Sequence, residues 1–167
     1  MRAWYAVRVR SQYERAVQLR LQSLSIEEFV PTYEVEVRWT DRVKRSIRPL
    51  FPGYVFGRFD ARSEGFRVIQ QTGVVQILGS NLDPTPIPDE QINTVRKLIE
   101  SALPIQPSDF AIGEAVTIAS GPLAGVRGIV QKLKGSTRIV VNMEILRRSV
   151  NVEVEAALVE HIQEALR

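Results

Sequence analysis

The chain has 167 residues, enough for one medium domain or two small ones, and its 44% hydrophobic and 25% charged residues are typical of a folded protein. It contains no cysteine and one histidine, His161, which excludes disulfides and zinc ribbons and argues against a histidine-based metal site or catalytic relay. The formal net charge of +3 is compatible with contact to nucleic acid and does not require it.

The first residues predict a strand followed by a helix. Residues 4–9 fit a strand pattern, with Trp4, Ala6 and Arg8 on one face and Tyr5, Val7 and Val9 on the other. Ser11 and Glu14 then have the spacing of a capping box, in which Ser11 accepts from the Glu14 amide and Glu14 reaches back. Apolar residues follow at helical spacing, namely Tyr13, Val17, Leu21 and Leu24.

A long hairpin with a basic tip is predicted after this helix. Residues 29–39 alternate, with Tyr33, Val35, Val37 and Trp39 on one face and Glu34, Glu36 and Arg38 on the other. A charged stretch at 40–45 interrupts the run, and a second extended run begins near Ser46 and continues, after Pro52, as residues 54–59. The tip gathers Arg42, Lys44, Arg45 and Arg48. Residues 1–103 carry the whole charge excess, 15 − 12 = +3, against 7 − 7 = 0 for residues 104–167.

The pattern changes towards the second half of the chain. Residues 74–78 predict a short strand, and Pro88 opens a helix with apolar residues on one side at Ile92, Val95, Leu98, Ile99 and Ala102. Pro104 and Pro107 mark a semi-stiff linker, residues 104–109. Short β runs separated by glycines follow, at 115–119, 128–133, 138–143 and 149–155.

These patterns predict an α+β fold in two domains. Residues 1–103 are expected to form an α/β sandwich with an antiparallel sheet and flanking helices. Residues 110–167 are expected to form a small β-barrel, because closing a sheet of short strands removes its exposed edges.

The sequence offers no candidate active site. Gly121, Gly125 and Gly128 are spaced G-x-x-x-G-x-x-G, which is not a dinucleotide fingerprint, and they precede a strand and not a helix. We interpret them as turn glycines. We therefore expect no enzyme, no cofactor and no metal. With no run approaching the roughly 18 to 20 apolar residues of a membrane span, and no signal peptide, a cytoplasmic protein without membrane contact is expected.

One segment, residues 49–56, has an unusual pattern. A proline on each side of Phe51 prevents regular ladder pairing there, and Gly53 permits a sharp turn before the next strand. This geometry fits two interpretations. Phe51 and Tyr54 are either surface anchors for a partner or core aromatics beside a bulge.

The combination of motifs resembles the NusG family of transcription factors. Trp4-Tyr5-Ala6-Val7, the helix at 11–24 and Phe51-Pro52-Gly53-Tyr54-Val55 resemble the family's N-terminal domain. Residues 113–116 and 120–130 resemble its KOW motif. The resemblance covers essentially the whole chain in the right order. It implies a monomeric elongation or antitermination factor that suppresses pausing or modulates termination, with an SH3-like C-terminal barrel.

The resemblance also implies three sites. A groove lined by Tyr5, Phe51, Pro52, Gly53 and Tyr54 would dock on the clamp helices of RNA polymerase. The hairpin residues Arg42, Lys44, Arg45 and Arg48 would contact phosphates of upstream DNA or the non-template strand; alternatively, they only keep the edge strands soluble. The KOW turn, with Gly121, Pro122, Leu123, Gly125 and Gly128, would bind a ribosomal protein or a termination factor.

Three questions stay open at this point. Leu123 stands where general family members commonly have phenylalanine, which leaves the KOW partner undefined. The run from Tyr33 to Phe56 is closer to the specialised RfaH/UpxY-like antiterminators than to the housekeeping factor. The rival function is that of a KOW-containing RNA-binding or ribosome-associated protein, although a ribosomal protein is usually far more basic than +3.

Overall fold

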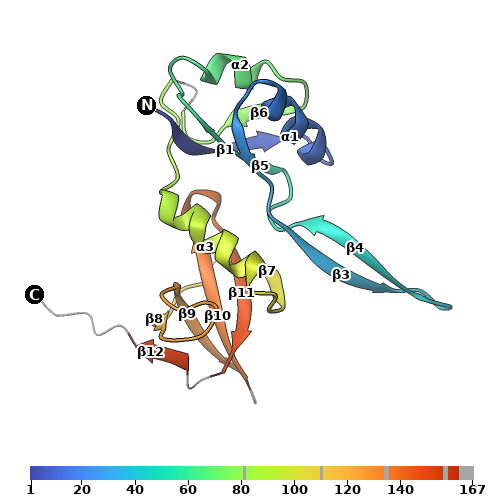
Figure 1. The fold of residues 1–167 in the computed structure, drawn as a ribbon, viewed down its shortest axis with the longest axis vertical. Helices are drawn as coiled ribbons and strands as arrows, with labels where there is room; N and C mark the ends of the chain where they lie inside the picture. Colours follow the sequence, from blue (N-terminus) through green and yellow to red (C-terminus); the bar gives the residue numbers. More distant parts are fainter. Residues whose placement is uncertain (81, 110, 134–135, 156–157, 162–167) are drawn as a thin grey trace, which may run out of the picture. The chain divides into compact units, whose positions relative to one another are not determined.

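The computed structural model describes residues 1–80, 82–109, 111–133, 136–155 and 158–161. The chain divides into two compact units, Met1–Ile92 and Asn93–Arg167 (Figure 1). In chain order the elements are β1 (Ala3–Val9), α1 (Glu14–Ser23), β2 (Glu27–Phe29), β3 (Thr32–Arg38), β4 (Val43–Pro49), β5 (Tyr54–Phe59), α2 (Gly65–Ile69), β6 (Val74–Ile77), α3 (Asp89–Glu100), β7 (Ile105–Asp109), β8 (Ala115–Ile118), β9 (Arg127–Leu133), β10 (Ser136–Met143), a 3₁₀ turn η1 (Glu144–Leu146), β11 (Arg148–Val154) and β12 (Val159–His161).

The first unit is built on a four-stranded antiparallel sheet with the order β2-β5-β1-β6. Strand β1 lies in the interior of the sheet, paired with β5 on one side and β6 on the other. Helices α1 and α2 connect these strands (Figure 1). This arrangement confirms the α+β class with an antiparallel sheet and flanking helices. From Trp4 to Val7, strand β1 is buried on both faces, as expected for an interior strand that is covered on each side.

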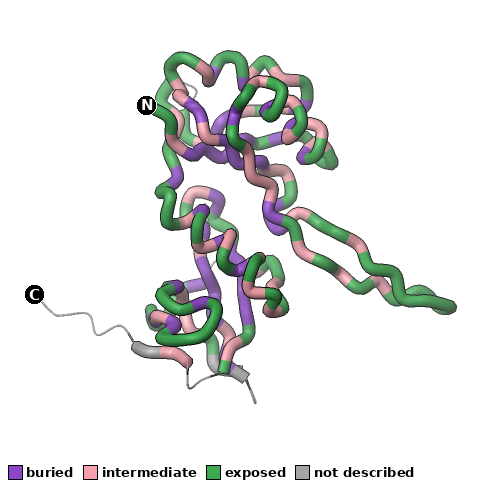
Figure 2. Tube along the Cα trace, viewed as in Figure 1, coloured by how far each residue is buried: buried purple, intermediate pink, exposed green. Residues whose placement is uncertain are grey.

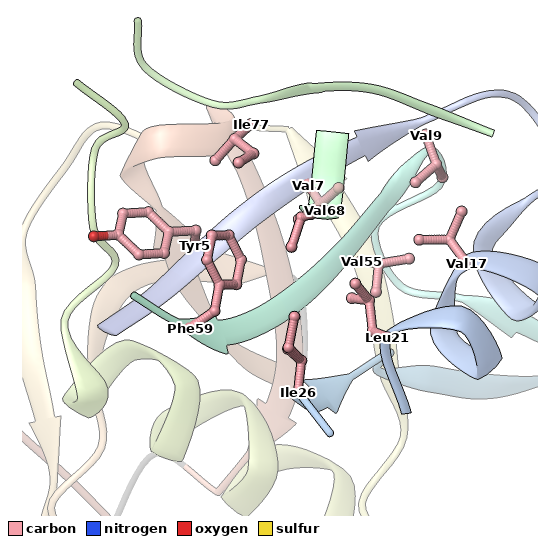
Figure 3. Packing of buried hydrophobic residues seen from close by; sticks show 10 residues of the cluster. All are labelled: Tyr5, Val7, Val9, Val17, Leu21, Ile26, Val55, Phe59, Val68 and Ile77. Atoms are coloured by element: carbon pink, nitrogen blue, oxygen red, sulfur yellow. The ribbon is translucent and has the colours of Figure 1, made fainter. Parts of the chain in front are cut away.

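One face of this sheet packs against the helices. Side chains from β1 and β5 meet the apolar stripe of α1 and Val68 of α2 in a single buried cluster (Figure 3). Its members are Tyr5, Val7, Val9, Val17, Leu21, Ile26, Val55, Phe59, Val68 and Ile77. Burying one such valine, leucine or phenylalanine side chain contributes about 1.5–3 kcal/mol. This cluster is therefore a principal source of the unit's stability.

The other face of the sheet is aromatic. In the β1–β5 register Ala6 lies opposite Phe56, and in the β2–β5 register Phe29 lies opposite Phe56, so these three share a face. The Phe56 ring contacts the Phe29 ring at 6.2 Å and the Phe51 ring edge-on at 5.8 Å between centroids. Trp4, from the same side of β1, is also buried. The segment that follows β4 therefore attaches to the sheet through Phe51.

The β3–β4 hairpin extends away from this sheet as a separate two-stranded ribbon (Figure 1). The predicted hairpin is confirmed, but its turn is tighter than expected. The Trp39 amide donates to the Arg42 carbonyl at 2.8 Å, so Thr40 and Asp41 alone form the connection. Most of the expected charged tip belongs to β4 itself. Exposed and partly exposed residues run along the whole hairpin (Figure 2).

The second unit contains a six-stranded antiparallel sheet with the order β12-β8-β9-β10-β11-β7. The four predicted β runs correspond to β8, β9, β10 and β11. Gly128 lies where β9 passes close to β10. A Cβ at this position would lie 2.5 Å from Ile139 Cγ2 and 2.8 Å from the Val140 carbonyl oxygen. Residue 128 is therefore a glycine for steric reasons.

Two expectations about the connection between the domains need revision. Residues 105–109, expected within the linker, form strand β7, in which Pro107 lies opposite Val150 of β11. This strand is at the end of the sheet order, where a proline with no N–H to donate is tolerated. The division between units falls within α3, after Ile92, and precedes the expected linker. The helix itself is confirmed, with Ile92, Val95 and Leu98 buried.

A polar clamp fixes the segment before α2. The Glu64 carboxylate accepts the Asp60 N–H at 2.8 Å and the Arg2 guanidinium at 2.7 Å. The backbone hydrogen bond from Asp60, and next the Arg2 side chain, hold the pKa of the Glu64 carboxyl below its usual range. A carboxyl with a depressed folded-state pKa stabilises the fold above its unfolded pKa, and this stability is lost as the pH falls through the folded value.

We therefore expect the Glu64→Gln variant to melt at a lower temperature than the unmodified chain at neutral pH. The gap should begin to narrow below the unfolded value of about 4.5 and should close as the pH falls through the lower folded-state value, where the unmodified carboxyl becomes protonated. Thermal melts at a series of pH values measure this gap. Glu34→Gln, on the exposed hairpin, is the control and should follow the unmodified chain throughout. A gap that does not change with pH would contradict the charge-dependent clamp.

Candidate functional site

The segment from Leu50 to Tyr54 is held by backbone hydrogen bonds to distant parts of the first unit. The Leu50 amide donates to the Pro31 carbonyl at 2.9 Å, and the Gly53 carbonyl accepts from Val9 of β1 at 2.8 Å. Within the segment, the Tyr54 amide donates to the Phe51 carbonyl at 3.2 Å. We call residues 51–54 the FPGY loop. These hydrogen bonds fix the backbone of the FPGY loop relative to the rest of the first unit.

Gly53 is the residue that shapes this loop. Its φ of +83° lies in the left-handed region, which favours glycine. Its N–H donates to the Glu14 Oε1 atom at 2.8 Å, and Glu14 is buried. The capping-box prediction is wrong, because α1 begins at Glu14 without a side-chain cap. Glu14 was missed as a site residue, because local sequence patterns do not predict a hydrogen bond between residues that are 39 positions apart.

The four loop residues differ in how far their side chains are exposed. Phe51 is only 2% exposed, with its ring edge against Phe56. Pro52 is exposed, and Gly53 and Tyr54 are half-buried. Of the two interpretations of the pattern, the core one describes Phe51. Pro52 and Tyr54 are the loop side chains that reach the surface.

Tyr5 is not brought to this loop. Its ring lies in the core cluster, with its centroid 4.9 Å from that of Phe59 (Figure 3). Tyr5 pairs with Gly57 on β5, whereas Tyr54 pairs with Arg8, an odd shift along β1 that places the two tyrosines on opposite faces. Burial, and next the charges of Asp60 and Asp83, raise the pKa of the Tyr5 phenol. Tyr5 therefore supports the sheet and does not line a groove beside Tyr54.

The hairpin register sorts the predicted nucleic-acid residues onto two faces. Because directly opposite residues share a face, one side, which we call the cationic face, consists of Tyr33, Val35, Val37, Trp39, Arg42, Lys44, Ser46 and Arg48. The other side, the mixed face, consists of Glu34, Glu36, Arg38, Val43, Arg45 and Ile47. The structure therefore groups Arg42, Lys44 and Arg48 and separates Arg45, which lies 3.6 Å from Glu36.

The predicted KOW partner residues surround a turn between β8 and β9. Gly121 and Gly125 have φ of +85° and +84°, as expected for turn glycines, and Pro122 is exposed. Leu123 is buried, so its side chain fills the interior below the turn. Gly128 is required by strand packing, as described above. The surface that the turn offers is therefore backbone, Pro122 and Ala124.

The part of the chain that the structure describes has neither a cluster of metal-ligating side chains nor a membrane-spanning helix. Its His, Asp and Glu side chains form no group of three or more that could hold a metal ion. Among these same residues, no helix is long and apolar enough to cross a membrane.

Comparison with known proteins identifies the family. The family model described as "Transcription termination factor nusG" matches residues 2–96, which is more than half of the chain. The chain belongs to the NusG family. Members of this family are transcription factors and not enzymes.

The match extends beyond the first unit. The chain is 32% identical to the transcription termination/antitermination protein NusG of Campylobacter jejuni, over 95% of this chain and 97% of that protein. It is 31% identical to the protein of the same name from Pseudomonas aeruginosa, over 95% of this chain and 98% of the relative. The solved structure of Thermotoga maritima NusG superimposes with a TM-score of 0.60 at 20% identity and covers 98% of both chains, which supports the fold.

Proposed function

We propose that this chain is a transcription termination/antitermination factor that binds RNA polymerase through its first unit and a second protein through its second unit. Membership of the NusG family supports the first part of this proposal. The observation that carries the binding site is the FPGY loop, which presents Pro52 and Tyr54 on a backbone fixed by Glu14, Val9 and Pro31.

A fixed loop with an aromatic side chain suits a protein partner. Tyrosine supplies contact area and a hydroxyl with few rotatable bonds, so little entropy is lost on binding. We assign the clamp helices of RNA polymerase as the partner of Pro52, Gly53 and Tyr54. Phe51 supports these residues from below through its contact with Phe56. The effect on transcription is conformational, because a bound factor shifts the polymerase only by its differential affinity for two states.

Two further contacts complete the proposal. The cationic face of the hairpin reaches upstream or non-template DNA beside the bound polymerase, with Arg42, Lys44 and Arg48 as the phosphate contacts. The turn at 121–125 binds a ribosomal protein or a termination factor through its backbone and Pro122. Both contacts are non-covalent, and they place the factor where RNA polymerase works, in the cytoplasm.

The Tyr54→Ala variant tests the polymerase site. We expect it to bind core RNA polymerase at least about thirtyfold more weakly than the unmodified chain, which is the effect of removing a hot-spot aromatic of about 2 kcal/mol. Titration of labelled factor with core polymerase measures the affinity. The matched control is Phe66→Ala, since Phe66 is a 71% exposed aromatic residue that belongs to α2 and not to the loop.

The outcomes separate the two candidate functions. Equal losses for Tyr54→Ala and Phe66→Ala would argue against the FPGY loop as the docking site. Binding to naked RNA that survives Tyr54→Ala, without retention on polymerase, would favour the RNA-binding alternative. Transcription in vitro across a pause site and a terminator, with and without the factor, then shows the direction of the effect.

A further inference from the structure

The β3–β4 hairpin is a two-stranded ribbon, so each of its strands has one paired edge and one outer edge. Backbone hydrogen bonds at its two ends, from Trp39 to Arg42 and from Leu50 to Pro31, show which opposite residues are hydrogen-bonded. Because hydrogen-bonded and non-hydrogen-bonded pairs alternate, the odd-numbered residues of β3 direct their backbone groups towards β4. The even-numbered residues direct theirs to the outer edge, where another strand can pair; these are Glu34, Glu36 and Arg38.

Strand β3 also carries the apolar part of the cationic face. Val35 and Val37 are half-buried, and Trp39 is 58% exposed. The residues directly opposite them on β4 are all polar, namely Ser46, Lys44 and Arg42. Burial of valine and indole side chains is favourable, and β4 offers these three no apolar neighbour. An apolar strand beside the outer edge of β3 would cover them.

The sequence of β3 is complementary to itself in one antiparallel register. In the register centred on Val37, two copies of Val37 lie opposite each other. Val35 of each copy then lies opposite Trp39 of the other, and Glu36 opposite Arg38. Aromatic–β-branched pairs and opposite-charge pairs both stabilise a sheet. Centring the pairing on Glu36 or on Val35 instead would place glutamates opposite each other, which destabilises.

The outer edge of β4 lacks this complementarity. Strand β4 carries Lys44, Arg45 and Arg48 and no carboxylate, so pairing with a second β4 brings like charges together. Pairing β4 with β3 of a second copy would again place polar residues beside the apolar ones of β3. It would also leave an outer edge free at each end, which gives an open chain of copies and not a closed pair.

We propose that β3 pairs with β3 of a second copy of this chain, joining two hairpins into one four-stranded antiparallel sheet with its two-fold axis at Val37. The hairpin extends away from the first sheet and Val37 lies near its tip, so the two first sheets would lie at opposite ends of the joined ribbon (Figure 1). Both cationic faces lie on the same side, because directly opposite residues share a face. Lys44 and Arg48 belong to the outer strands and stay accessible.

The proposed association is weak. A single pair of short strands buries much less than the roughly 1,200 Å² of a stable interface. We expect a dissociation constant on the order of 100 µM. The monomer implied by the family resemblance is then the state at low concentration, and the pair forms where the local concentration of the factor is high.

The first test is a charge exchange followed by sedimentation of the full chain. The unmodified chain should be monomeric at about 5 µM and largely paired at about 500 µM. Arg38→Glu places two carboxylates opposite each other, and Glu36→Arg places two guanidinium groups opposite each other. Each variant alone is expected to associate at least about tenfold more weakly. An equal mixture of the two should recover the association, because every carboxylate then lies opposite a guanidinium group.

Recovery in the mixture also shows that both variants are folded. Glu34→Arg is the matched control. It makes the same change at the same edge and on the same face, but Thr40 lies opposite Glu34 in this register. This variant should therefore associate nearly as the unmodified chain does.

The second test uses a single cysteine, since the chain has none of its own. Val37→Cys places two thiols at the two-fold axis. Opposite residues of a non-hydrogen-bonded pair have Cα atoms about 4.5 Å apart, which is within disulfide range. Oxidised glutathione should therefore convert Val37→Cys into a covalent dimer much faster than Val35→Cys, whose thiol would lie opposite Trp39.

Three results would overturn the pairing: a monomer at about 500 µM, association unaffected by Arg38→Glu, and no recovery in the mixture. Equal cross-linking of Val35→Cys and Val37→Cys, or a loss for Glu34→Arg as large as that for Glu36→Arg, would overturn the register. Tyr54→Ala should associate as the unmodified chain does. Failure of the β3 pairing is therefore distinguishable from failure of the polymerase site.

Discussion

Replacing Phe51 by alanine is expected to lower the free energy of unfolding of the first unit by about 3–5 kcal/mol, the usual cost of deleting a buried phenylalanine ring. Phe51 is 2% exposed, and its ring meets Phe56 edge-on at 5.8 Å. The deletion leaves a cavity below the FPGY loop. Denaturant unfolding followed by tryptophan fluorescence measures the loss, because buried Trp4 reports on the first unit.

A second variant at the same position shows whether Phe51 supports the loop or contacts the partner directly. Phe51→Leu keeps an apolar side chain in the core and should cost clearly less than Phe51→Ala, because it leaves a smaller cavity. If Phe51 only supports the loop, Phe51→Leu retains most of the polymerase affinity while Tyr54→Ala loses it. A loss for Phe51→Leu as large as that for Tyr54→Ala, with normal stability, would show that the Phe51 ring itself meets the partner.

The second large effect concerns Glu14. Glu14→Ala removes the acceptor of the Gly53 N–H and is expected to lower the free energy of unfolding by about 1–3 kcal/mol, the cost of an unsatisfied buried donor. Glu14→Gln keeps an oxygen at the same position and should recover more than half of this loss. The Gly53 amide, followed by NMR, should exchange faster with solvent in Glu14→Ala and close to normally in Glu14→Gln.

Binding shows whether Glu14 positions the site. We expect Glu14→Ala to weaken polymerase binding under conditions where the variant is still folded, because the loop backbone is less restricted before binding. Glu28→Ala is the matched control. Its carboxylate accepts from Gln18 at 2.7 Å and Gln22 at 2.6 Å and does not contact the loop. Unchanged Gly53 exchange in Glu14→Ala would contradict the positioning role.

Much of the secondary structure could be predicted, because it depends on local periodicity. The alternation of residues at 4–9 and 33–39 predicted two strands and also which residues share a face of the hairpin. This is possible because side chains alternate between the two faces of a strand, whatever the strand packs against. The helical spacing of Val17 and Leu21 likewise predicted α1 and its buried side. Strand β7 was missed because two nearby prolines are typical of a linker, and only the strand's place at the sheet edge accommodates Pro107.

Within the candidate site, the sequence by itself determined the chemical types: an aromatic, proline- and glycine-containing loop, a basic hairpin and a glycine-rich turn. The tertiary structure alone decided which of these side chains reach the surface. In the structure, Tyr5, Leu123 and Phe51 are buried, while Pro52 and Tyr54 reach the surface. Arg45 lies on the opposite face of the hairpin from Arg42, Lys44 and Arg48. Glu14 accepts a hydrogen bond from the Gly53 N–H. The physical reason is that local periodicity fixes the relative orientation of neighbouring residues. Exposure depends on what packs against each face, and that is decided by strand pairing and contacts between residues distant in the chain.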